Sequence, residues 1–305
     1  MKGIKMENHY LAIDVGGTKV KYGLVNHSGE LVERGNQPTN RRDLKTFVAQ
    51  LQAIIALYHD DIRGVGISLP VRVNHDTGTI HAGVMWSFLD GVDLKTALQL
   101  DLPLAIENDG KAAALAELWV GELKGVANGL ALVLGTGVGG GFVIDGQLHY
   151  GAHYEAGELS FIYHKITTDR ESRFGFTGSA VEMIKEIATK LELPDVHDGE
   201  KVFEFINAGY PQAKRIFNQY ARTIALQIQN LQATVDIERV VIGGGISAQP
   251  IVTATIREAY EAFYQGNPYI NRMISHVDIV PGKFGNDANL YGAIYRLLLE
   301  LNQEA

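Results

Sequence analysis

Two segments of the chain repeat one pattern, in which an apolar run ends in a glycine-rich turn and a second apolar run follows at once. The first segment is Leu11 to Val25, with Asp-Val-Gly-Gly-Thr-Lys at positions 14–19, and the second is Leu130 to Ile144. Apolar runs separated by a tight turn predict β-hairpins. Because the pattern occurs twice, the sequence predicts a protein of two similar halves.

Both turns have the composition of a loop that binds phosphate. Glycines let backbone amides approach an anion, and threonine and lysine add a hydroxyl and a cation. Asp14, at the end of the first predicted strand, is suited to hold Mg²⁺ through water. The predicted phosphate-binding residues are Asp14, Gly16, Gly17, Thr18 and Lys19 in the first turn and Gly135, Thr136, Gly137 and Gly139 in the second. For either turn alone, an ordinary β-turn is the alternative.

The second turn also fits a different chemistry, since the spacing of Gly135, Gly137 and Gly140 matches the fingerprint of dinucleotide-binding folds. That fingerprint requires a helix directly after the loop, with its N-terminus at the pyrophosphate. Here Phe142 to Ile144, followed by Asp145-Gly146, predicts a strand and a turn. The sequence therefore argues against dinucleotide binding.

A third glycine-rich segment lies between a predicted strand at Ile237 to Ile242 and a predicted helix from about Pro250 to Tyr264. The order of strand, glycines and helix brings bare backbone and a helix N-terminus towards a nucleotide. We therefore add Gly243, Gly244 and Gly245 to the predicted phosphate-binding residues.

Polar residues follow a further predicted strand, Leu102 to Ile106, in the sequence Glu107-Asn108-Asp109. Ligands of open α/β sheets bind beyond the carboxyl ends of strands, which makes this position informative. The alternative is that Asn108 or Asp109 only caps the helix predicted at Lys111 to Trp119.

A polar loop follows the predicted strand Gly64 to Ser68 and leads towards Trp86. Its length and its polar and aromatic residues suit one wall of a sugar site, and a plain loop is the alternative. Ser68 and Pro70, where the strand stops, are the candidate substrate-binding residues of this segment.

The segment Gly151 to Phe161 carries Glu155 and Glu158, separated by small residues. Both glutamates are candidate substrate-binding residues, and exposure to solvent is the alternative for each. The stretch around Glu158 is richer in glycine and alanine than an ordinary surface helix.

The composition narrows the classes of function. The chain has 305 residues, of which 46% are apolar, enough for two domains with buried cores. A formal net charge of −8 without a basic run disfavours nucleic acid and anionic membranes as partners. The chain has no cysteine, which excludes disulfides and thiolate zinc sites. No signal peptide or long apolar span is visible, so we expect a soluble cytoplasmic protein.

The remaining pattern predicts further strands and helices. Strands are expected at Leu31 to Arg34 and Val277 to Val280, and helices at Leu44 to Tyr58 with Asp43 or Thr39 as cap, Asp93 to Leu100, Ser179 to Leu191, Glu200 to Asn207, Gln212 to Ala233 and Leu290 to Leu301. The segment His164 to Thr177 has no clear period and supports no prediction.

Taken in order, five motifs make the chain resemble the ROK family of sugar kinases and repressors over nearly its full length. They are DVGGTK at 14–19, END at 107–109, LGTGVGGG at 134–141, AGE at 156–158 and IGGG at 242–245. The resemblance implies an α/β protein with the actin-like ATPase fold, in which two similar ribonuclease-H-like domains hold ATP and sugar in a central cleft. We expect one domain at 1–120, completed by a C-terminal helix at 290–305, and the other at 121–289.

The resemblance also implies roles for single residues. In that family the residue that matches Asp109 is the general base, and those that match Asn108 and Glu158 bind sugar hydroxyls. The implied activity is ATP-dependent phosphorylation of a hexose or hexoside hydroxyl, which we predict to be O6, with Mg²⁺ bound through water by Asp14. N-acetylmannosamine kinase, N-acetylglucosamine kinase and fructokinase are the alternatives. A homodimer is expected from the resemblance alone.

The chain departs from the family at its zinc site. The family's common zinc site uses a histidine after Ala-Gly-Glu and a cluster of cysteines, but Phe161 stands at the histidine position and cysteine is absent, so zinc is not expected. The glutamate that normally lies within the cysteine cluster is not evident, and Arg173 falls nearest to its position. A similar cysteine-free pattern occurs among the family's β-glucoside kinases. We therefore predict glucose or a β-glucoside as substrate, over an N-acetylated hexosamine.

Two classes without catalysis compete with the kinase. Sugar-responsive repressors of this family carry a helix-turn-helix module ahead of the kinase-like fold. Here the first glycine hairpin begins near Tyr10, which, with the acidic charge, disfavours a repressor. A sugar-binding or assembly protein is the other class. We expect a small-molecule sugar and ATP as partners, and neither nucleic acid nor a membrane.

Overall fold

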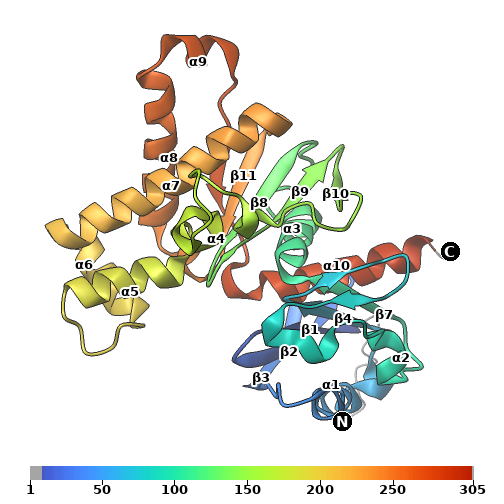
Figure 1. Cartoon of the computed structure of the whole chain (residues 1–305). Helices are drawn as coiled ribbons and strands as arrows, with labels where there is room; N and C mark the ends of the chain where they lie inside the picture. Colours follow the sequence, from blue (N-terminus) through green and yellow to red (C-terminus); the bar gives the residue numbers. More distant parts are fainter. Residues whose placement is uncertain (1–8, 304–305) are drawn as a thin grey trace. The chain divides into compact units, whose positions relative to one another are not determined.

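A computed structural model describes residues 9–303 of the chain, which divide into two compact units (Figure 1). Of the described residues, unit 1 contains 9–121, Tyr150–Ala156 and 287–303, and unit 2 contains Glu122–His149 and Gly157–Asn286. Each unit is built on one five-stranded sheet. The division into domains at 1–120 and 121–289 stays a prediction.

The sheet of unit 1 has the strand order β3-β2-β1-β4-β7. Its strands are β1 His9–Val15, β2 Lys19–Asn26, β3 Leu31–Pro38, β4 Val65–Leu69 and β7 Leu104–Asn108. The first three form an antiparallel meander, and β4 and β7 run parallel to β1. A separate small hairpin, β5 Arg72–Val73 with β6 Ile80–His81, was not predicted because runs of two residues have no readable period.

Two layers of helices cover the sheet of unit 1 (Figure 1). The helices are α1 Leu44–Ala56, α2 Leu94–Leu98, α3 Asp109–Val120 and α10 Ala288–Gln303, with short 3-10 helices at His59–Asp61, Val84–Leu89 and Gly285–Asp287. Leu11 and Ile13 of β1 pack with α1 and α2, whereas Tyr10 and Ala12 pack with α10. This division follows from the alternation of side chains along a strand.

Two glycines let α10 come close to its neighbours. A Cβ atom on Gly66 of β4 would lie 2.4 Å from the carbonyl oxygen of Ala293, and one on Gly292 would lie 1.7 Å from that of Ala112 in α3. No side chain fits at either position. The C-terminal helix is therefore built into unit 1 by backbone contact with both the sheet and α3.

The sheet of unit 2 repeats the arrangement of unit 1. Its order is β10-β9-β8-β11-β12, with β8 Gly129–Leu134, β9 Val138–Ile144, β10 Gln147–His149, β11 Arg239–Gly243 and β12 Asp278–Pro281. Three antiparallel strands are again followed by two strands parallel to the first. The prediction of two similar halves is confirmed.

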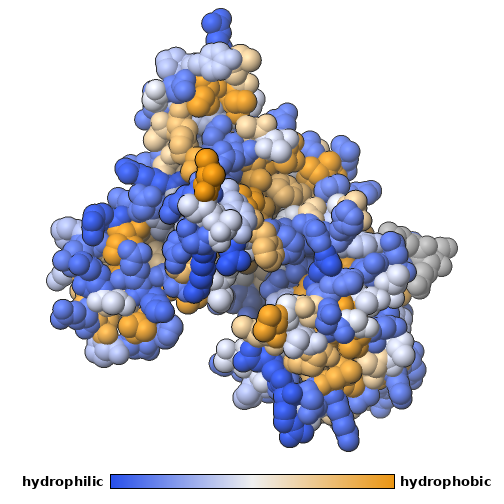
Figure 2. Space-filling view, in the orientation of Figure 1, coloured by the Kyte–Doolittle hydropathy of each residue, from blue (hydrophilic) through white to orange (hydrophobic). Residues whose placement is uncertain are grey.

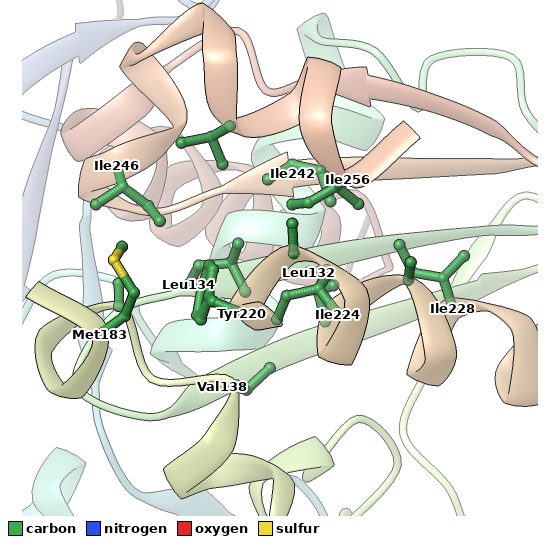
Figure 3. Packing of buried hydrophobic residues seen from close by; sticks show 14 of the residues in the cluster. Leu132, Leu134, Val138, Met183, Tyr220, Ile224, Ile228, Ile242, Ile246 and Ile256 are labelled. Atoms are coloured by element: carbon green, nitrogen blue, oxygen red, sulfur yellow. The ribbon is translucent and has the colours of Figure 1, made fainter. Parts of the chain in front are cut away.

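The helices of unit 2 are mostly those that periodicity predicts. They are α4 Phe174–Thr177, α5 Ala180–Lys190, α6 Gly199–Asn207, α7 Pro211–Val235, α8 Pro250–Gln265 and α9 Pro268–Met273, with 3-10 helices at Leu159–Phe161, Arg170–Ser172 and Gly245–Ala248. Figure 3 shows their core, in which Leu132 and Leu134 of β8 meet Ile224 of α7 and Ile256 of α8. The short elements α4, α9 and β10 were not predicted.

Hydrophilic side chains cover most of the face seen in Figure 2, with hydrophobic ones in separate patches. Large apolar side chains that are exposed include Val84 and Met85 in unit 1 and Phe161 and Ile166 in unit 2. Within residues 9–303, none of the helices combines the length and the apolar composition needed to cross a bilayer.

Candidate functional site

The carboxyl ends of three parallel strands in unit 1 bring the predicted polar residues into one row. In the register of the sheet, Asp14 of β1 pairs with Ser68 of β4, and Ser68 pairs with Glu107 of β7. Asn108 and Asp109 follow directly. This edge is where open α/β sheets bind their ligands.

Asp14 is a buried carboxylate, 7% exposed. The Asn289 amide donates a hydrogen bond to Asp14 Oδ1 at 3.0 Å, and Lys21 Nζ lies 3.6 Å from Oδ2. Burial raises the pKa of Asp14, and the Asn289 amide and the Lys21 ammonium oppose that rise. Asn289 lies far away in the sequence, so periodicity and spacing alone could not associate it with Asp14.

The described residues contain no group of three or more His, Asp or Glu side chains able to hold a metal ion. A single carboxylate nevertheless fits Mg²⁺, which keeps several waters and takes one or two carboxylates together with the phosphates of a substrate. The donors at this edge are therefore compatible with a hydrated magnesium ion at Asp14.

Three hydrogen bonds to backbone carbonyl groups of the first glycine turn hold it in place. The Gly16 amide donates to the Lys19 carbonyl at 3.0 Å, the Thr39 hydroxyl donates to the Gly16 carbonyl at 2.8 Å, and the Thr39 amide donates to the Thr18 carbonyl at 2.9 Å. Gly17 is half-buried, whereas Thr18 and Lys19 are exposed. Their hydroxyl and ammonium groups are thus accessible to an anion.

Asn108 caps α3, as the alternative interpretation expected. Its Oδ1 accepts from the Lys111 amide at 3.1 Å, and its Nδ2 donates to the Val71 carbonyl at 3.1 Å. A side-chain amide carries two N–H donors, so this anchoring still leaves Asn108 one donor for a sugar hydroxyl. Capping and sugar binding are compatible here.

Asp109 is the first residue of α3 and is half-buried. Its Oδ1 accepts from the Gly110 amide at 2.8 Å. The first turn of a helix is a favourable place for an acidic side chain. Ser68 is fully buried in β4 and Pro70 is half-buried just beyond it. Contact of Ser68 and Pro70 with a substrate stays a prediction.

The segment Tyr150–Ala156 belongs to unit 1 although the residues on both sides of it belong to unit 2. The predicted substrate-binding residue Glu155 lies in this segment and forms an ion pair with Arg72 Nη1, at the start of the β5–β6 hairpin. Its side chain is 56% exposed. Substrate binding by Glu155 stays a prediction, and it would have to compete with this ion pair.

The second glycine turn, in unit 2, is tied to the start of α5. The Gly135 amide donates to the Gly137 carbonyl at 3.0 Å, and the Gly135 carbonyl accepts from the Ala180 amide at 3.0 Å and from the Ser179 hydroxyl at 3.3 Å. Thr136 is exposed, and a Cβ on Gly135 would meet no atom within 4 Å. Gly139 lies inside β9, where it pairs with Val133.

The third glycine segment lies beside the second, because β11 and β8 are parallel neighbours and Gly243 pairs with Val133. Gly244 has φ +91°, and a Cβ there would lie 2.2 Å from the Leu134 carbonyl oxygen. Only glycine fits this position. Gly245 is exposed and starts a 3-10 helix, and α8 begins at Pro250, as the sequence predicted.

Glu158 follows a glycine that is forced into close contact with β9. Gly157 has φ +89°, and a Cβ there would lie 2.4 Å from the Gly140 carbonyl oxygen. This contact fixes the backbone that carries Glu158 in unit 2. Phe161, at the family's histidine position, ends the following 3-10 helix and is 64% exposed.

Sequence comparisons find relatives along almost the whole chain. The ROK family profile matches residues 10–299. A β-glucoside kinase of Listeria monocytogenes is 28% identical over 96% of this chain and 98% of its own length. A glucokinase of Halalkalibacterium halodurans is 30% identical over 93% of each chain.

The fold has close counterparts among solved structures. The crystal structure of a ROK family protein from Streptococcus pneumoniae in complex with sucrose superimposes with a TM-score of 0.86, at 27% identity, over 97% of this chain and 99% of that one. The predicted actin-like ATPase fold is thereby confirmed. By its motifs, its paired sheets and its match over almost the whole sequence, the chain belongs to the ROK family.

Proposed function

We propose that this chain transfers the γ-phosphoryl group of ATP to O6 of glucose or of a β-glucoside, with Asp109 as general base. The relatives reported above include kinases named for glucose and for β-glucosides, which supports an ATP-dependent sugar kinase. The observation that carries the proposal is the position of Asp109, at the carboxyl end of β7 and the N-terminus of α3.

Asp109 would accept the proton of the attacking hydroxyl while Asn108, held by Val71 and Lys111, orients the same turn. A carboxylate at a helix N-terminus is a weak base. Phosphoryl transfer passes through a loose transition state, however, and depends more on positioning and charge neutralisation than on early proton removal. A weak but well-placed base is therefore sufficient.

Each unit has glycine segments whose backbone and side-chain donors suit phosphate oxygens. Thr18 and Lys19 in unit 1 and Thr136 in unit 2 are exposed next to glycines, as such a role requires. Mg²⁺ at Asp14 would neutralise charge on the phosphate groups. We further propose a cytoplasmic location, since the reaction consumes ATP, and a homodimer.

If Asp109 is the general base, Asp109→Asn should lose turnover but keep sugar binding. Turnover should fall by roughly 10²–10⁴-fold, because the variant keeps the shape of the turn but cannot take up the proton. Sugar binding, followed by intrinsic fluorescence, should persist. The control is Asp101→Asn, which changes an exposed aspartate bound to His59 before β7 and should leave turnover unchanged. Near-wild-type turnover of Asp109→Asn would refute the assignment.

Substrate choice follows from the groups around the sugar hydroxyls. Phe161 replaces a polar residue by an exposed apolar ring, which favours a glucoside over a hexosamine whose amide needs polar partners. Glucose, cellobiose, N-acetylmannosamine, N-acetylglucosamine and fructose should be compared by kcat/KM. A preference for either amino sugar of more than about tenfold, or about 1.4 kcal/mol, would reject this choice while the kinase assignment stands.

A further inference from the structure

Glu107, next to the turn that carries Asp109, is a buried carboxylate without a role in the proposed chemistry. It is 1% exposed. Its Oε1 accepts from the backbone amide of Asn108 at 2.8 Å. β7 ends at Asn108, and the side chain of Glu107 thus fixes the peptide plane from which the Asn108-Asp109 turn starts.

The second oxygen of Glu107 is held by the segment Tyr150–Ala156. The Tyr150 hydroxyl donates to Glu107 Oε2 at 2.6 Å and accepts from Arg296 Nη1 of α10 at 3.2 Å. The His75 Nε2 atom lies 3.5 Å from the same oxygen, and its ring packs edge-on against Tyr150 with centroids 4.8 Å apart. Three segments that lie far from Glu107 in the sequence thus meet around its carboxylate.

The charges of this cluster keep Glu107 ionised. Burial alone would raise the pKa of Glu107, but hydrogen bonds from His75 and Tyr150 and the charge of Arg296 hold that pKa below its ordinary value. Burial and the neighbouring carboxylate raise the pKa of Tyr150, so its hydroxyl keeps its proton and remains a donor. An ionised, fully bonded carboxylate has one fixed orientation.

We propose that Tyr150 is a positioning residue for the phosphoryl transfer: its hydroxyl fixes Glu107, and Glu107 sets the peptide that aims Asn108 and Asp109. The inference rests on the proposed function. Small displacements of a reacting group lower the rate steeply, by about a hundredfold for 1 Å. Loss of one hydroxyl group outside the reacting groups should therefore reduce turnover.

Tyr154 provides a matched control. It lies in the same segment, its ring packs against His75 at 5.6 Å and against Tyr150 at 6.0 Å, and its hydroxyl binds Asp76 rather than Glu107. Tyr154→Phe and Tyr150→Phe remove the same atom from the same type of side chain. Only the Tyr150 hydroxyl bonds directly to the carboxylate that fixes the catalytic turn.

The test compares steady-state turnover of the two variants, below their melting temperatures and with glucose, cellobiose and ATP. We expect Tyr150→Phe to lower kcat by about tenfold or more, with KM for ATP unchanged, and Tyr154→Phe to keep kcat within about twofold of wild type. If both variants lose thermal stability but keep kcat, Tyr150 only clamps the segment and the inference is wrong.

A double-mutant cycle tests the route through Glu107. If Tyr150 acts through that carboxylate, the double variant Tyr150→Phe/Glu107→Gln should have the same kcat as Glu107→Gln alone. A double variant whose fold-loss in kcat is the product of the two single losses would overturn the inference. Should Glu107→Gln not fold, Arg296→Met takes its place, because methionine lacks the N–H group that donates to the Tyr150 hydroxyl. If the wild-type protein releases no ADP in the presence of sugar, both the proposed function and this inference are wrong. If the wild-type protein is active but Tyr150→Phe and Tyr154→Phe have the same kcat, only this inference is wrong.

Discussion

Three consecutive residues, Glu107, Asn108 and Asp109, occupy three different environments at the end of one strand. Glu107 is buried, Asn108 ends β7 and caps α3, and Asp109 is half-buried at the helix start. The change from strand to helix within three residues separates the buried carboxylate of Glu107 from the half-buried carboxylate that we propose as general base.

The burial of Glu107 predicts how stability depends on pH. Its folded pKa is lowered from 4.5, so the unfolded chain binds the proton more readily. The stability that Glu107 contributes is therefore complete above a pH of about 4.5 and is lost as the pH falls through the lower folded pKa. We expect Glu107→Gln to be less stable than wild type at pH 7, with a difference that shrinks towards pH 3.

Urea unfolding midpoints at pH 7, 5, 4 and 3 measure this difference. The exposed residue Glu171 supplies the control, since Glu171→Gln should follow the wild-type curve at every pH. If the difference in urea midpoint between wild type and Glu107→Gln stays constant down to pH 3, the lowered pKa of Glu107 is contradicted.

At the scale of single elements, α5 and the second glycine turn depend on one side chain. The Ser179 hydroxyl caps α5 by accepting from the Glu182 amide at 3.1 Å, and it also donates to the Gly135 carbonyl at 3.3 Å. Ser179 is 1% exposed. A helix cap and a candidate phosphate loop are therefore joined by the same oxygen atom.

Ser179→Ala should lower the free energy of unfolding by about 1 kcal/mol through the lost cap, and it should also raise KM for ATP because the turn loses a restraint. Asp198→Ala is the comparison, since Asp198 caps α6 through the Lys201 amide without touching a glycine turn. We expect Asp198→Ala to affect stability only. Equal KM values for ATP in both variants would show that Ser179 does not organise the turn.

At the scale of the molecule, the chain passes between its two units four times, and the last passage returns it to unit 1. The core cluster beside α10 joins Leu290, Ile294 and Leu297 to Tyr10 and Ala12 of β1. The main cluster of unit 2 includes no residue of α10. The two units therefore depend on the C-terminal helix to different degrees.

A chain that stops after Asn286 should lose the fold of unit 1 and keep that of unit 2. Hydrogen exchange would measure this, with amides of β1 and β4 losing protection and those of β8 and α7 keeping it. The full-length chain is the control. Protection of β4 in the shortened chain would mean that the remaining helices, α1, α2 and α3, are enough to stabilise the sheet.

Local patterns in the sequence predicted the two glycine hairpins, Asp43 as one of two candidate caps, and most helices and strands of the repeated sheets. These features depend on residues within a few positions of one another, because alternation, helical spacing and capping act over one or two turns. The motifs also identified Asp14 and the Asn108-Asp109 turn as the candidate site.

Only the tertiary structure decided which distant residues support that site. Asn289 beside Asp14, and Tyr150, His75 and Arg296 around Glu107, come from segments with no pattern in common. Their contacts arise because the sheet of unit 1 gathers strand ends, the C-terminal helix and the segment Tyr150–Ala156 at one edge. Because an unpaired buried charge costs free energy, the buried carboxylates need these partners. The partners are distant in the sequence, so no local periodicity predicts them.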